Sequence, residues 1–145
     1  MKQILVDANV LISFLTDRNL RQREKADDLL RKAAAREHRL ILHNNSIVEM
    51  IYVLTQIYHE KREAVAEDLS DLLAMPGVIS KDEIVWSLVL EQWPATIPAL
   101  GDAILATVAI SGGIDSVATF DRDLAKRLSR QGVSLFWPLR GLAPS

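Results

Sequence analysis

The stretch ILVDANVLI, residues 4–12, decides the fold of this chain. Residues 3–6 form an apolar run typical of a short buried strand, and residues 9–16 have the apolar spacing of a short helix. Asp7 stands where the predicted strand ends. A carboxylate at this place either caps the following helix or lies at the edge of a sheet, where ligands bind. The rest of the sequence has to distinguish a structural cap from a site residue.

The same alternation of strands and helices continues along the chain. Further strands are predicted at residues 40–42, 78–79, 116–119 and 133–136, and helices at 20–37, 44–58, 61–75, 82–92, 101–112 and 121–131. The strands are continuous apolar runs, which indicates a sheet covered on both faces. The sequence therefore predicts one α/β domain over residues 1–145, with a short, mostly parallel sheet flanked by helices.

Composition restricts the kinds of site that this chain can build. It has no cysteine and three histidines, so a metal site would use oxygen ligands and a reducing cytoplasm is the expected location. Asp7 and Asn9 interrupt the apolar start, which argues against a signal peptide. No run approaches the roughly 20 apolar residues of a membrane span, so we expect a cytoplasmic protein without a membrane partner.

Charge alone does not indicate nucleic-acid binding. The formal net charge is -2, although basic residues gather in two segments. The first holds Arg18, Arg21, Arg23, Lys25, Arg31, Lys32, Arg36 and Arg39, and the second holds Arg122, Lys126, Arg127 and Arg130. Solvated helix faces are the favoured interpretation of each segment by itself.

Four carboxylates stand at predicted junctions or inside an apolar helix. Asp7, Asp102 and Asp121 each precede or begin a helix, where an aspartate commonly caps free N–H groups. Glu49 lies in SIVEMIYVL, which is apolar on nearly every side and is therefore predicted to be buried. A buried carboxylate needs a partner or an ion.

Taken together, the four carboxylates predict a metal site. Asp7 and Asp121 follow strands, and the carboxyl ends of parallel strands share one edge of a sheet. Two carboxylates about 5 Å apart repel by about 3 kcal/mol at an effective dielectric of about 20, so a cluster requires a cation. Oxygen ligands favour Mg²⁺ or Mn²⁺, and such ions activate water for phosphodiester hydrolysis.

The segments ILVDANVLI, SIVEMIYVL, GDAILATVAI and VATFDRDL, in this order, resemble the PIN-domain ribonucleases, and most of all the VapC-type toxins of toxin–antitoxin pairs. The resemblance implies an α/β/α sandwich and an endoribonuclease that cleaves single-stranded RNA with one or two Mg²⁺ or Mn²⁺ ions. It assigns the acidic positions to Asp7, Glu49, Asp102 and Asp121, with Asp123 as the alternative fourth ligand. Supporting positions match Asn9, Ser46 and Thr119.

The resemblance also implies a homodimer and a cognate antitoxin. Many toxins of this group carry a net positive charge, whereas this chain is slightly acidic. Local basic residues therefore matter more for RNA binding, and we expect RNA contacts at Arg18, Arg21 and Arg122. Leu11, Ile12, Phe14 and Leu15, with the basic helix that follows, are a candidate groove for an antitoxin helix. Trp86 is expected in the core, whereas Trp93 and Trp137 suit either core or interface.

Two other functions compete with the nuclease. Haloacid-dehalogenase-like phosphohydrolases carry a second aspartate two residues after the first, where this chain has Asn9. Receiver domains need an acidic pair near the first strand, which is absent here. A PIN-like module that only binds a partner protein would tolerate the loss of carboxylates, whereas this chain has the full acidic set. His43 has no catalytic partner in the sequence and is interpreted as structural or exposed.

Overall fold

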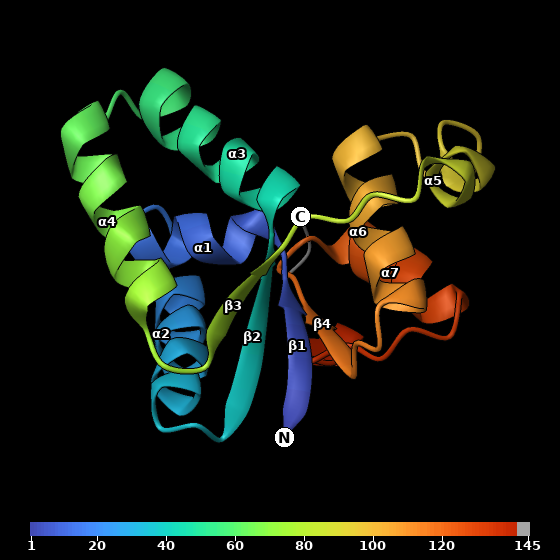
Figure 1. Ribbon diagram of the computed structural model, residues 1–145, viewed down its shortest axis with the longest axis horizontal. Helices are drawn as coiled ribbons and strands as arrows, with labels where there is room; N and C mark the ends of the chain where they lie inside the picture. The colour runs from blue at the N-terminus through green and yellow to red at the C-terminus, as the bar shows by residue number, and fades with distance from the viewer. Residues whose placement is uncertain (142–145) are drawn as a thin grey trace.

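The computed structural model describes residues 1–141, and the strands in this range form a central sheet (Figure 1). The strands are β1 (Lys2–Val6), β2 (His38–His43), β3 (Val78–Lys81) and β4 (Ser116–Ala118), in the order β3-β2-β1-β4. Every neighbouring pair is parallel. The carboxyl ends of all these strands therefore meet at one edge of the sheet, as the sequence predicted.

Helices cover both faces of the sheet (Figure 1). One side carries α1 (Ala8–Leu15), α2 (Leu20–Ala34), α3 (Asn44–Tyr52) and α4 (Arg62–Ala74), and the other side carries α5 (Trp86–Gln92), α6 (Leu100–Ser111) and α7 (Arg122–Arg130). A π-helical turn, Val53–Ile57, extends α3, and a 3-10 turn spans Leu139–Gly141. This arrangement confirms the predicted α/β/α fold. No helix among residues 1–141 is long and apolar enough to cross a membrane.

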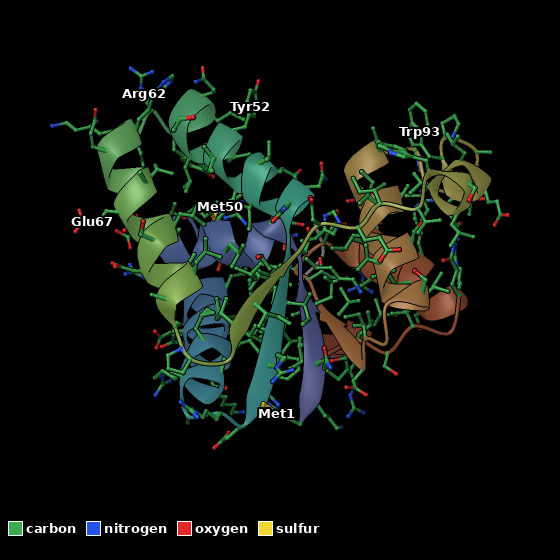
Figure 2. All side chains as sticks on the ribbon, viewed as in Figure 1. Met1, Met50, Tyr52, Arg62, Glu67 and Trp93 are labelled. Carbon is green, nitrogen blue, oxygen red and sulfur yellow. The ribbon has the colours of Figure 1, made fainter. Side chains whose placement is uncertain are left out.

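The strands divide the core into two halves because successive side chains point to opposite faces. Ile4 and Val6 pack with α1, α2 and α3. The Met50 side chain of α3 packs in the same half of the core (Figure 2). Leu5 points the other way and packs against α6 and α7. Both faces are therefore buried, which explains the continuous apolar runs in the strand sequences.

Three predicted elements differ from the structure. Residues 133–136 are not a strand, because Leu135 makes only an isolated bridge to Val117. The helix predicted at 82–92 begins only at Trp86, since Val85 is still extended. The helix predicted at 20–37 ends at Ala34, and Arg36 then takes a left-handed conformation with φ of 63°.

Several apolar side chains that were expected in the core lie on the surface. Val48 and Tyr52 on α3 are 65% and 59% exposed, so the expectation of a helix buried on nearly every side is wrong. Trp86 is 51% exposed, which also contradicts its predicted place in the core. Trp93 and Trp137 are half-buried, and the Trp137 ring stacks on Phe120 with centroids 4.7 Å apart. Figure 2 shows Tyr52 standing out from its helix.

Candidate active site at the carboxyl edge of the sheet

Asp7 is the buried centre of a hydrogen-bonded group at the carboxyl edge. Its Oδ2 accepts a hydrogen bond from Thr119 Oγ at 2.7 Å. The same hydroxyl oxygen accepts from the Asp121 N–H at 3.0 Å and from Asn9 Nδ2 at 3.4 Å. Asn9 Oδ1 accepts from the Phe120 N–H at 3.2 Å, which joins the start of α1 to the segment after β4. The structure therefore brings Asn9 and Thr119 to Asp7.

Glu49 and Asp102 approach each other from α3 and α6. A glycine, Gly101, lies at the start of α6, and a Cβ there would stand 3.5 Å from Asn45 Nδ2 and 4.0 Å from Glu49 Oε2. The Glu49 carboxyl group therefore lies beside the first turn of α6, although the residue as a whole is exposed. Asp102 is the third residue of α6 and belongs to the same turn. Ser46, one turn before Glu49, is buried.

Burial and neighbouring carboxylates raise the pKa values of acidic side chains at this site. Burial is the main cause that raises the pKa of Asp7 to about 7, and the charges of Asp102 and Glu49 raise it further, against the Thr119 hydrogen bond. Burial, followed by the charges of Asp121 and Glu49, raises the pKa of Asp102 to about 6. Partial burial also raises the pKa of Glu49. The four carboxylates thus interact electrostatically around one site.

Capping explains only one of the three junction aspartates. Within residues 1–141, the Asp7 side chain makes no cap hydrogen bond to α1. Asp102 lies inside the first turn of its helix and is not the cap. Asp121 is a true cap, because its Oδ1 accepts from the Leu124 N–H at 3.1 Å. Asp123 is exposed on the first turn of α7. The charge of Asp121 acts on Asp102, so Asp121 is the better placed of the two aspartates.

The donor chemistry of this site fits a hard divalent cation. Its side-chain donors are carboxylate oxygens. Burial, followed by the charges of neighbouring carboxylates, raises the pKa values of Asp7 and Asp102, and a bound cation would stabilise their charged forms. Among residues 1–141, no three acidic or histidine side chains are close enough to hold one ion in common. Binding an ion would therefore require the carboxylates to draw together, which the exposed Glu49 side chain can do.

Basic side chains lie on both sides of this group. Arg18 donates from Nη2 to the Asn9 carbonyl at 2.8 Å and from Nε to Ser13 Oγ at 3.0 Å, whereas Arg21 is exposed on α2. Arg122 begins α7 directly after Asp121. Much of the first basic segment is neutralised by its own helix, because Arg31 pairs with Asp27 at 3.1 Å.

The sequence does not indicate the contacts that Arg127 makes in the structure. Its Nη1 donates to the Thr96 carbonyl at 2.6 Å, and its positive charge lowers the pKa of Asp102. The only sequence signal was its membership of the second basic segment, which gives no indication of the contact with residue 96. The candidate antitoxin groove also needs correction, because Leu11 and Ile12 are buried in the core and cannot line a groove.

Comparisons with known proteins identify the family. The sequence profile described as PIN domain matches residues 4–129. The chain belongs to the PIN domain family. A search of curated protein sequences found no significant match. Among solved structures, VapC20 of Mycobacterium tuberculosis, described as a sarcin–ricin loop cleaving toxin, has a TM-score of 0.66 at 18% identity, over 93% of this chain and 99% of that chain.

A second solved structure shares the fold of this PIN domain. VapBC2 of Rickettsia felis, bound to a DNA fragment from its promoter, has a TM-score of 0.65 at 15% identity. The match covers 94% of this chain and 99% of that chain. At these identities the likeness concerns the fold, and it extends over nearly the whole length of both proteins.

Proposed function

We propose that this PIN domain is a metal-dependent endoribonuclease and the toxin of a toxin–antitoxin pair in the cytoplasm. The observation that carries the proposal is the group of four acidic side chains at the carboxyl edge, where burial and the charges of neighbouring carboxylates raise the pKa of Asp102 to about 6 and that of Asp7 to about 7. Such a group is unfavourable unless a cation is bound. The family and the RNA-cleaving toxin of similar fold support RNA as the substrate.

The residues have distinct roles in this proposal. Asp7, Glu49 and Asp102 would hold Mg²⁺ or Mn²⁺, and Asp121 would complete the site. Such an ion would supply an activated water molecule and stabilise negative charge on the leaving oxygen. Thr119 fixes the Asp7 carboxylate through its 2.7 Å hydrogen bond, and Asn9 joins the start of α1 to the segment after β4. Supporting roles therefore fall on side chains that are already hydrogen-bonded.

Arginine side chains near the carboxylates suit contacts with RNA phosphates. Arg18 lies in the turn before α2, Arg21 lies on α2, and Arg122 begins α7. Arg127 joins them, because its charge acts on Asp102 while one guanidinium nitrogen is held by Thr96. Arginine binds phosphate with several N–H donors in a fixed arrangement, which positions the substrate backbone.

The test is cleavage of labelled RNA by the purified chain. We expect cleavage in Mg²⁺ or Mn²⁺ that EDTA abolishes, and loss of cleavage in Asp7→Asn with the fold retained. Asp71→Asn, an exposed position on α4, is the control and should cleave normally. Activity that survives EDTA, or full activity in Asp7→Asn, contradicts the proposal. Absence of cleavage with every ion and RNA would instead favour a PIN domain that only binds a partner.

The partners are a cognate antitoxin and a second copy of this chain. One of the solved structures of similar fold is a VapBC pair bound to promoter DNA, which supports an antitoxin here. Co-purification with the product of the adjacent reading frame tests this partner.

Exposed apolar side chains on α3, α5 and α6 support the homodimer. Of these helices, α3 lies on one side of the carboxyl edge, and α5 and α6 lie on the other (Figure 1).

A further inference from the structure

His43 is buried at the junction of β2 and α3, and both of its ring nitrogens face backbone groups. It is 1% exposed and occupies the N-cap position of α3. Nδ1 accepts from the Asn45 N–H at 3.1 Å, and Nε2 lies 3.0 Å from the Glu83 carbonyl oxygen. A carbonyl only accepts and an amide N–H only donates, so the neutral ring with its proton on Nε2 satisfies both contacts.

A second hydrogen bond joins the same two segments of the chain. Asn44 Nδ2 donates to Asp82 Oδ1 at 2.9 Å. The first turn of α3 is thus joined at two places to the segment that follows β3, and Figure 1 shows this segment passing the start of α3 on its way to α5. The charged residues next to His43 in this arrangement are Lys81, its partner in the β2–β3 register, with Asp82 and Glu83.

The same turn of α3 contacts α6. Asn45, whose N–H is bonded to His43, has its side-chain nitrogen beside Gly101, and the Glu49 carboxyl group lies beside the same glycine. A displacement at the start of α3 would therefore move both side chains relative to the first turn of α6. His43 touches neither Glu49 nor Asp102 in the contacts described above, so it can influence the site only through the helix.

We propose that neutral His43 is a positioning residue that holds the first turn of α3 and thereby sets the place of Glu49 beside the first turn of α6. The proposal rests on the proposed function in one respect, because it treats Glu49 as a metal ligand. Partners that orient ligands typically contribute ten- to a hundredfold to metal affinity, so the effect of His43 is expected on this scale. Its test must include a measurement without metal or RNA.

The metal-free measurement is nuclear magnetic resonance of the ¹⁵N-labelled full chain. We expect Nε2 of His43 to be protonated, Nδ1 to be unprotonated, and a scalar coupling between Nδ1 and the backbone nitrogen of Asn45 across their hydrogen bond. A proton on Nδ1 overturns the proposal. In His43→Ala the amide signals of Gly101 and Asp102 should shift, although both lie on another helix. Unchanged signals at these two residues also overturn it.

Two substitutions of His43 distinguish the loss of both ring hydrogen bonds from the loss of the Nε2 hydrogen bond alone. In His43→Ala we expect Mn²⁺ affinity to fall about tenfold or more. His43→Asn keeps an N-cap acceptor and should restore most of that affinity, together with the Gly101 and Asp102 signals. His59→Asn, an exposed histidine with φ of 56°, is the control and should bind Mn²⁺ as the unchanged chain does.

The outcomes also distinguish this proposal from the proposed function. Unchanged Mn²⁺ affinity in His43→Ala overturns the positioning role, whatever the chain does to RNA. Failure of the unchanged chain to bind Mn²⁺ or to cleave RNA contradicts the proposed function instead. In that case the tautomer, the coupling to Asn45 and the signals of the α6 turn still decide whether His43 positions α3.

Discussion

At the scale of single residues, Asp7 opposes the stability of the metal-free fold. Its pKa rises from an ordinary 3.8 to about 7 because the side chain is buried beside other carboxylates. The folded chain therefore binds more protons than the unfolded chain between about pH 4 and pH 7. The free energy of unfolding must fall as pH rises through this window. The buried Asp7 carboxyl group therefore lowers the stability of the fold at neutral pH.

Asp7→Asn should remove this cost. At pH 8 without divalent ions, we expect the variant to be more stable than the unchanged chain by about 1–3 kcal/mol, with a weaker decline between pH 4 and pH 7. The asparagine oxygen can still accept the Thr119 hydrogen bond, so the fold is kept. Urea unfolding at several pH values measures the effect. An equally steep decline in the variant would contradict the assigned role of Asp7.

At the scale of elements, α6 owes its position to small side chains. Ala103 and Ala106 are fully buried against the sheet, and Asp102 is carried by the same helix. Ala106→Leu would overpack this contact and should destabilise the fold by about 1–3 kcal/mol while it displaces Asp102 from Glu49. Ala64→Leu, at an exposed position of α4, is the control and should change stability little. Chemical denaturation compares the two.

The elements also show what the sequence was able to predict. Asp7, Asp102 and Asp121 lie at the strand ends and helix starts predicted for them, because such junctions leave local signals in the sequence. The α5 helix was misjudged, since periodicity identifies Trp86 and Leu90 as apolar without revealing that the helix buries only Val89. The contacts of His43 with residue 83 and of Arg127 with residue 96 join distant segments, and no local pattern records them.

At the scale of the whole molecule, exposed apolar surface points to self-association. Val48 and Tyr52 form one patch, and a second patch joins α5 to α6. The second patch contains Leu88 and Ile110, which line one hollow between α5 and α6, whereas Trp86 and Leu90 are exposed on another face of α5. Six side chains of this size expose on the order of 500 Å², a large part of the roughly 800 Å² per partner in a standard interface. A two-fold dimer in which each patch meets the other would bury both at once.

Sedimentation velocity tests this arrangement. We expect a dimer for the unchanged chain and a monomer for Leu88→Glu or Ile110→Glu, because a buried unpaired charge is unfavourable at the centre of an interface. Leu20→Glu, at an exposed position on α2, is the control and should remain dimeric. A monomer in the unchanged chain contradicts the dimer, and a dimer that survives both substitutions contradicts this interface.

The parallel strands also determine which end of the protein suits attachment to a solid support. Met1 precedes β1 at the end opposite to the carboxyl edge, as the N label in Figure 1 shows. The five residues of β1 separate the two ends by about 16 Å. A fusion partner or an immobilising linker attached at Met1 would therefore leave the carboxyl edge open to solution. Molecules tethered in this way would present the same face to solution.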